Sequence, residues 1–242
     1  MGRPSDINFD RIDFISAYCD RWCERCAFTS RCSAYAVDVA MAMCDGDFAA
    51  ALELAVGAPP PKDRAEAARR EAVHELLSNY QPSKLELDEI GRDEEARGER
   101  LDESPITTGA KRFSTLAWGW LQSNRNAGDL TSNQPLTEAI AVAGWDAHLI
   151  GAKLHRALHG RDEYEQGNGF DDGPVQNDWN GSAKVALISI RRSVDAWAAI
   201  ATTTDDADAA AVGEELRRLE TEVERTFPDA WKFIRPGFDQ VP

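Results

Sequence analysis

The sequence lacks the features that mark membrane, secreted and nucleic-acid-binding proteins. No apolar run approaches the roughly 20 residues that cross a bilayer, and the first residues lack the basic and apolar stretches of a signal peptide. Acidic residues outnumber basic ones by 42 to 27, and the formal net charge of −15 opposes binding to a phosphate backbone. We therefore expect a soluble, bacterial-type protein with no membrane and no nucleic acid among its partners.

Motifs for common enzyme classes are also missing. The chain has neither a glycine-rich phosphate loop nor a G-x-S-x-G nucleophile turn, and it contains only four histidines. Its five cysteines are an odd number, and four of them lie within fourteen positions, whereas secreted disulfide scaffolds usually spread theirs along the chain. This usage favours the reducing cytoplasm as the location.

Helical periodicity dominates the rest of the chain and predicts an all-α fold. Apolar residues recur at three-and-four spacing, no strand alternation is present, and the 43% of hydrophobic residues is enough for a globular core. The spacing predicts helices over residues 8–26, 33–44, 47–56, 62–79, 110–121, 136–158, 182–200 and 209–233.

These segments suggest three parts. Residues 1–60 form a small N-terminal helical lobe that carries the cysteine cluster, and residues 61–109 form a helix followed by an acidic linker. Residues 110–242 form a helical bundle, interrupted by a loop between positions 160 and 181 that is rich in Gly, Asn, Asp and Glu.

The cysteine cluster is the feature that points most directly to chemistry. Cys19, Cys23, Cys26 and Cys32 follow the pattern C-x3-C-x2-C-x5-C. If the first helix continues through Cys26, three thiols form one stripe on its face, and Cys32 folds back over them after a turn. Four thiolates can bind either tetrahedral zinc or an iron-sulfur cluster.

The spacing favours a 4Fe-4S cluster, with zinc as the alternative. Structural zinc sites usually join two separated C-x2-C pairs, whereas these four ligands lie in one short segment. Neighbours on a helix face are about 5–6 Å apart at Cβ, which suits ligands spread around a bulky cluster. The remaining cysteine, Cys44, is expected to be a core residue of its helix.

Two short resemblances concern the same cysteines. The segment from Cys19 to Cys26 resembles the C-x3-C-x2-C motif of radical S-adenosylmethionine enzymes, although Arg25 stands where that family prefers an aromatic residue and no barrel pattern follows. The spacing from Cys23 to Cys32 is similar to the last three cluster ligands of helix-hairpin-helix DNA glycosylases. Both resemblances imply an iron-sulfur cluster as cofactor.

Histidines and carboxylates provide further candidates for a site in the helices. His148 and His155 share one face of a predicted helix, and with Asp195 they are the candidates for a catalytic site. Glu71 and His74 have the Glu-x-x-His spacing of di-iron bundles. Charges that interrupt apolar faces either lie in solvent or form an internal polar pocket, for which the candidates are Trp145, His148, Lys153 and Asp195.

Three functions follow from these candidates. The first is a cytoplasmic iron-sulfur protein whose cluster serves redox transfer, sensing or structure, with a redox or protein partner. The second is an interaction module stapled by zinc. The third is an oxidoreductase, ferritin-like or dependent on the cluster, with a His and carboxylate site in the bundle.

Overall fold

A computed structural model describes residues 10–57, 64–124, 133–167 and 173–239, and these residues are helical or irregular, without a strand. The chain divides into two compact units. The N-terminal unit comprises Met1–Ser16 and Arg21–Ala96, and the bundle unit comprises Ala17–Asp20 and Arg97–Pro242. The prediction of an all-α fold is therefore confirmed for the described residues, and the sequence-based boundary at residues 60 and 61 lies outside them.

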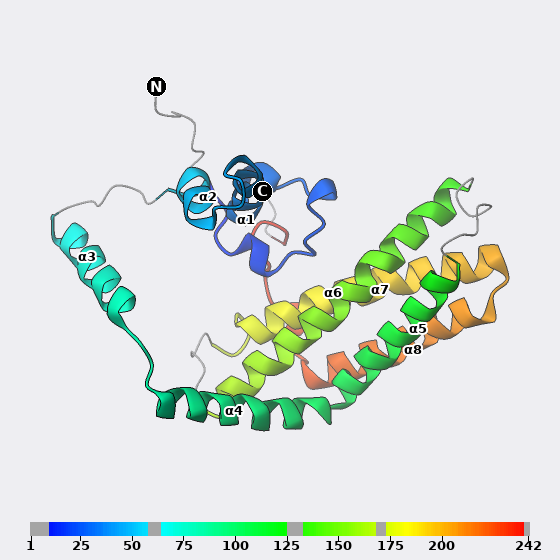
Figure 1. The fold of residues 1–242 in the computed structure, drawn as a ribbon. Helices are drawn as coiled ribbons and strands as arrows, with labels where there is room; N and C mark the ends of the chain where they lie inside the picture. The colour runs from blue at the N-terminus through cyan, green and yellow to red at the C-terminus, as the bar shows by residue number, and fades with distance from the viewer. Residues whose placement is uncertain (1–9, 58–63, 125–132, 168–172, 240–242) are drawn as a thin grey trace. The chain divides into compact units, whose positions relative to one another are not determined.

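Four long helices form the bundle unit, as the periodicity predicted (Figure 1). Helix α5 packs on α6 and α8, and α7 packs on the same two helices, so each helix has two neighbours. Every helix begins at a residue whose side chain accepts a backbone N–H bond of the first turn, which satisfies groups that the helix cannot pair itself. The bounds are α5 Pro105–Ser123, α6 Gln134–Glu165, α7 Asp178–Thr204 and α8 Ala207–Thr226.

The core of the bundle is large and closely packed. Trp197 on α7 is fully buried and meets Trp120 of α5 edge to face, with ring centroids 5.4 Å apart. The indole N–H of Trp120 donates to Asp206 Oδ2 at 2.8 Å, so a core side chain also binds the residue that caps α8. Burial of aromatic side chains supplies much of the stability of such a core.

The N-terminal unit contains two short helices with a much smaller core. Helices α1 (Ser33–Met43) and α2 (Phe48–Ala55) pack on each other around three buried alanines, Ala40, Ala51 and Ala55. Asp47 caps α2 by accepting from Ala50 N–H at 3.0 Å, as its sequence position predicted. Cys44, which was expected to be a core residue, is half-buried at the C-cap of α1 and packs against this small core from outside.

Two further helices follow in the chain, α3 (Arg64–Asn79) and α4 (Lys84–Asp102). The acidic linker expected within residues 81–109 is wrong, because most of it is α4. Ser83 and Glu86 form a capping box: Ser83 N–H donates to Glu86 Oε2 at 2.7 Å, and Glu86 N–H donates to Ser83 Oγ at 3.2 Å. The Glu, Arg and Leu residues that follow have high helix propensity, and together with the capping box they favour a helix over a linker.

The helix predicted over residues 8–26 is also wrong. In its described part the chain forms separate 3-10 turns, η1 (Ile15–Ala17) and η2 (Cys23–Arg25), and a third, η3 (Thr29–Arg31), follows. Phe14 and Arg21 have φ values of 59° and 58°, in the left-handed region that a right-handed helix cannot include. The single stripe of thiols on one helix face therefore does not exist.

The remaining helical predictions differ mainly in their ends. Helix α6 continues to Glu165, so the predicted break after residue 160 is shorter than expected, and residues 168–172 of it lie outside the described part. The last predicted helix ends at Thr226 and is followed by a 3-10 turn, η5 (Ala230–Lys232). Every described helix is too short or too polar to span a bilayer.

Candidate functional site

Cys23 and Cys26 lie at the two ends of one tight turn. Cys26 N–H donates to the Cys23 carbonyl oxygen at 3.1 Å and closes the 3-10 turn. Cys26 is the C-cap of this turn and has an extended backbone conformation. Phe28 N–H donates to Cys26 Sγ at 3.4 Å.

Cys32 lies at the junction between the cysteine turns and helix α1. It is the buried member of the group and stands at the N-cap of α1, where its carbonyl oxygen accepts from Ala36 N–H at 3.1 Å. Arg11 Nη1 donates to the same carbonyl at 3.0 Å, and its Nη2 donates to the Ala55 carbonyl at 3.2 Å. One guanidinium group thus ties the end of the cysteine turns to the end of α2.

The four predicted ligands do not all belong to one unit. Cys19 belongs to the bundle unit, whereas Cys23, Cys26 and Cys32 belong to the N-terminal unit. Among the described residues, no three His, Cys, Asp or Glu side chains are grouped so that they could hold a metal ion. Cysteine sulfurs are the donors that a thiophilic metal prefers. A metal centre at these residues stays a prediction.

The segment Ala17–Asp20, which we call the strap, is fixed to helices α6 and α7. Lys153 Nζ donates to the Ala17 carbonyl oxygen at 2.8 Å, and Trp145 Nε1 donates to the Asp20 carbonyl oxygen at 2.8 Å. Both donors are on α6, and Lys153 is buried. Because a buried ammonium group is costly without acceptors, the strap supplies a partner that the bundle needs.

A buried charge network reinforces the attachment of the strap. Arg192 on α7 donates to both carboxylate oxygens of Asp146, which is 0% exposed, and its Nη1 donates to Asp20 Oδ2 at 2.6 Å. Burial raises the pKa of Asp146, and the hydrogen bonds from Arg192 act against this rise. Arg192 thereby joins a carboxylate of the core to a carboxylate of the strap.

Tyr18 inserts its ring between helix α7 and the C-terminal segment. Its ring centroid is 4.7 Å from that of Phe233, and its hydroxyl donates to Asp178 Oδ1 at 3.1 Å. Both rings lie against Gly181, where a Cβ atom would clash with Tyr18 and would lie 2.7 Å from Phe233 Cζ. The absence of a side chain at Gly181 makes this close approach possible.

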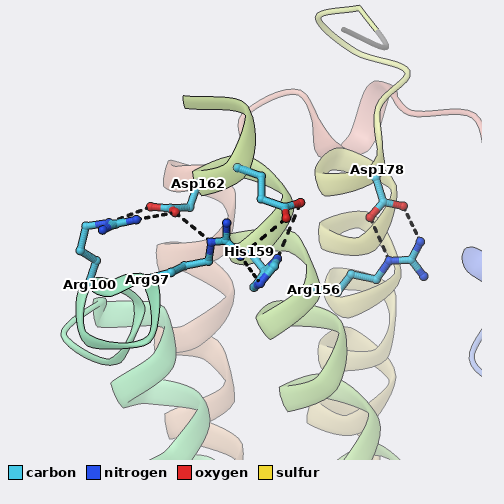
Figure 2. Close-up of polar contacts among 7 residues, drawn as sticks. Arg97, Arg100, Arg156, His159, Asp162 and Asp178 are labelled. Atoms are coloured by element: carbon cyan, nitrogen blue, oxygen red, sulfur yellow. Dashed lines mark hydrogen bonds and ion pairs between the residues drawn. The ribbon is translucent and has the colours of Figure 1, made fainter. Parts of the chain in front are cut away.

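A second polar cluster joins the end of α4 to α6 (Figure 2). Arg100 Nη2 donates to Asp162 Oδ2 at 2.8 Å, and the buried Arg97 donates to the same oxygen at 3.3 Å. Arg97 also lies 2.9 Å from His159 Nε2. The hydrogen bond from Arg100 is the main cause that lowers the pKa of Asp162, and Arg97 contributes to it. Figure 2 also shows Arg156 bound to Asp178 through both carboxylate oxygens.

The candidates for an enzymatic site lie on the outside of their helices. His148, His155 and Asp195 are exposed, and the ring of His148 packs against Trp118, with centroids 4.4 Å apart. Glu71 and His74 are exposed on α3. The alternative of an internal polar pocket is not realised, since Lys153 is buried while His148 and Asp195 face solvent.

Sequence reasoning missed the strap. Lys153 and Arg192 place charges on apolar helix faces, and Trp145 brings an indole N–H, so each of the three needs a polar partner. Their partners Asp20 and Ala17 are 125 to 172 residues away in the chain, as the separations of the three hydrogen bonds show. No local pattern encodes that pairing.

Comparison with known proteins gives no relative for the chain. No family model matches it, and neither a curated protein nor a solved structure matches it.

Proposed function

We propose that Cys19, Cys23, Cys26 and Cys32 hold a 4Fe-4S cluster that serves a redox, sensing or structural role beside the helical bundle. Four thiolates are the usual ligand set of such a cluster. Cys19 and Cys23 are separated by four residues, which span at most about 14 Å. A protein of this kind works in a reducing cytoplasm, with a redox or protein partner rather than nucleic acid.

The small hydrophobic core of the N-terminal unit is the observation that best supports this proposal. Its buried apolar residues are few and mostly small: Ile15, Cys32, Ala40, Ala51 and Ala55. Large side chains of the same unit are exposed, among them Phe14 at 76% and Met43 at 71%. Units with so little apolar burial usually depend on disulfides, a metal or a partner for stability. A metal centre at the cysteine turns meets this need.

The local geometry of the turns gives additional support. Cys23 and Cys26 share one 3-10 turn, and Cys26 Sγ already accepts a backbone hydrogen bond. Hydrogen bonds to the sulfurs stabilise bound thiolates and are one of the terms that tune cluster potentials.

Zinc is the second candidate, and the C-x2-C turn favours it. A structural zinc site commonly includes such a pair. The loss of the predicted helical stripe also removes one reason for preferring a cluster. The compact spacing of all four cysteines in one segment is the reason that remains, and it keeps iron and sulfide ahead of zinc.

Metal analysis of anaerobically purified protein tests the proposal. We expect a brown protein with about four irons and four sulfides per chain, and an electron paramagnetic resonance signal after reduction or oxidation. The variants Cys23→Ala and Cys26→Ala should lose the metal, whereas Cys44→Ala, outside the quartet, should retain it. A colourless protein with one zinc supports the second candidate. A wild-type protein without metal, or equal metal in all variants, contradicts both.

A further inference from the structure

Cys23 and Cys26 are separated by a distance that a disulfide spans. Cys26 N–H donates to the Cys23 carbonyl oxygen at 3.1 Å, so the two residues close one 3-10 turn. Such a turn rises about 2.0 Å per residue, which separates their Cα atoms by about 6 Å. The dihedral angles of Glu24 and Arg25 set this separation, so the extended conformation of Cys26 does not alter it. Disulfides commonly join Cα atoms about 5.5–6 Å apart.

The same two thiols are also accessible. Cys23 and Cys26 are half-buried, the two residues between them are exposed, and their turn contains no buried residue. The other cysteines of the N-terminal unit differ, because Cys32 is buried and Cys44 packs against the small core. A small reagent therefore reaches Cys23 and Cys26 more readily than Cys32 or Cys44.

The residues around the pair are basic in an otherwise acidic chain. Residues 21–31 contain three arginines and one glutamate, whereas the whole chain has 42 acidic and 27 basic residues. Arg25 stacks on Trp22, the residue before Cys23, with its guanidinium carbon 3.6 Å from the ring centroid. Reactive cysteines typically lie in electropositive, partly exposed surroundings. A negatively charged reagent is attracted to this segment and repelled by most of the chain.

We propose that Cys23 and Cys26 form a redox-active dithiol that exchanges with small disulfides that carry carboxylates, the class to which glutathione disulfide belongs. The sulfur of one cysteine attacks the small disulfide, which forms a mixed disulfide and releases one small thiol. The second cysteine attacks the mixed disulfide at the protein sulfur, which forms the bond between Cys23 and Cys26 and releases the second small thiol. The pair thus loses two electrons and two protons, and the small disulfide gains them.

The dithiol goes beyond the proposed function and needs no metal. It uses two of the sulfurs that the proposed metal centre also uses, so the disulfide removes Cys23 and Cys26 as ligands. Oxidation should therefore prevent metal loading, and bound metal should protect the pair from oxidation.

Peptide mapping of the full chain identifies which cysteines pair. Trypsin cuts after the arginines between the cysteines, so the four cysteines of the cluster lie on four different peptides, residues 12–21, 22–25, 26–31 and 32–62. Chelator-treated protein is equilibrated with glutathione and glutathione disulfide, and the remaining thiols are blocked with iodoacetamide. We expect peptides 22–25 and 26–31 to be joined in the main product. In urea, where the hydrogen bond of the turn is lost, the equilibrium constant for this pair should fall about fivefold.

Substitutions separate the role of the thiols from that of the charge. Cys26→Ala should abolish the joined peptides, whereas Cys44→Ala should retain them. Arg25→Gln should slow oxidation by glutathione disulfide about twofold relative to oxidation by the neutral hydroxyethyl disulfide, because it removes one attractive charge near the sulfurs. Arg92→Gln is the matched control, because it removes the same charge from an exposed position on α4 and should leave this ratio of rates unchanged.

The possible failures are distinguishable. If other cysteines pair in the main product, or if Cys23 and Cys26 pair equally well in urea, the turn does not position these thiols and the dithiol is overturned. An unchanged ratio of rates in Arg25→Gln overturns the preference for disulfides that carry carboxylates. Metal-loaded protein that oxidises as fast as metal-free protein contradicts the proposed function, while the dithiol stands.

Discussion

The two units obtain their order in different ways. The bundle unit buries large side chains such as Phe113, Trp197 and Phe227, and its four helices each pack on two others. The N-terminal unit buries three alanines between α1 and α2, and the described residues of α3 are exposed. Apolar burial contributes about 25 cal/mol per Å², so the bundle has a source of stability that the N-terminal unit largely lacks.

The distribution of cysteines follows this difference. Four of the five, Cys23, Cys26, Cys32 and Cys44, belong to the unit with the small core, whereas Cys19 belongs to the bundle unit and the long helices of that unit contain no cysteine. A unit with a small hydrophobic core can gain stability from a metal that its thiols bind. A well-packed bundle does not depend on such a metal for its stability. The comparison therefore predicts that the units respond differently to metal removal and to core truncation.

Removal of the proposed metal should have the largest effect, and it should be confined to the N-terminal unit. Structural metal sites supply on the order of 10 kcal/mol in small domains. We expect a chelator to abolish hydrogen-exchange protection in α1 and α2 while α5 to α8 remain protected. The chelated Cys26→Ala variant serves as control, because it should show no further change. If α1 and α2 were equally protected before and after chelation, the N-terminal unit would not depend on metal for its stability.

Truncation of the bundle core should have the next largest effect, in the opposite unit. Phe113→Ala removes a ring that is 1% exposed and should lower the free energy of unfolding of the bundle by about 3–5 kcal/mol. Met43→Ala, at a position 71% exposed in the N-terminal unit, should change stability by less than about 0.5 kcal/mol. Denaturant unfolding followed by circular dichroism measures both. Similar losses for the two substitutions would contradict the assignment of the main core to the bundle.

The sequence predicted the regions with local signals and missed those with distant partners. Periodicity located α1, α2 and α5 to α8 from their apolar residues, and all of these helices except α1 also begin at a residue whose side chain caps the first turn. Helix α4 was missed although Ser83 and Glu86 are a recognisable capping box, since its charge was interpreted as a linker. The capping box is a local signal, and it predicts the start of this helix from the sequence alone.

The start of the chain was not predictable in the same way. The cysteines were recognised as candidate ligands, but their placement on one helix was wrong, because Phe14 and Arg21 have left-handed φ values. The strap is held by Lys153 and Trp145, more than a hundred residues away in the chain. Such tertiary bonds override local helical propensity and leave no signal in the spacing of nearby residues.

A methyl group at Gly181 should have a moderate effect that is specific to the strap. Gly181→Ala places Cβ against Tyr18 and Phe233, and overpacking of this kind typically costs about 1–3 kcal/mol. Exchange of residues 17–20 should become faster, while α5 and α8 should keep their protection. Gly144→Ala on α6 is the control, because its Cβ meets no atom within 4 Å and should stabilise the helix by up to about 1 kcal/mol. If Gly181→Ala and Gly144→Ala changed the exchange of residues 17–20 equally, the close approach of Tyr18 and Phe233 to Gly181 would be excluded.

The smallest effect should come from the pH dependence of the C-terminal segment of the bundle unit. Burial acts to raise the pKa of Asp239, but hydrogen bonds from Arg235 and Lys184 outweigh it and hold the pKa well below its ordinary value. The folded state thus binds this proton less readily than the unfolded state does. The stabilising contribution of Asp239 is complete above the ordinary aspartate pKa of about 3.9, and it is lost as pH falls through the lowered pKa.

Asp239→Asn should therefore lower the free energy of unfolding of the bundle unit at pH 6. The difference in this free energy between the variant and wild type should shrink as the pH falls below 4. Denaturant unfolding at several pH values measures this difference. Asp229→Asn is the matched control, because Asp229 pairs with Lys232 at an exposed position. A constant difference between Asp239→Asn and wild type at all pH values would show that Asp239 acts through packing. A difference in free energy of unfolding that narrows only in Asp239→Asn ties the acid response of the bundle unit to the pairing of Asp239 with Arg235 and with the buried Lys184.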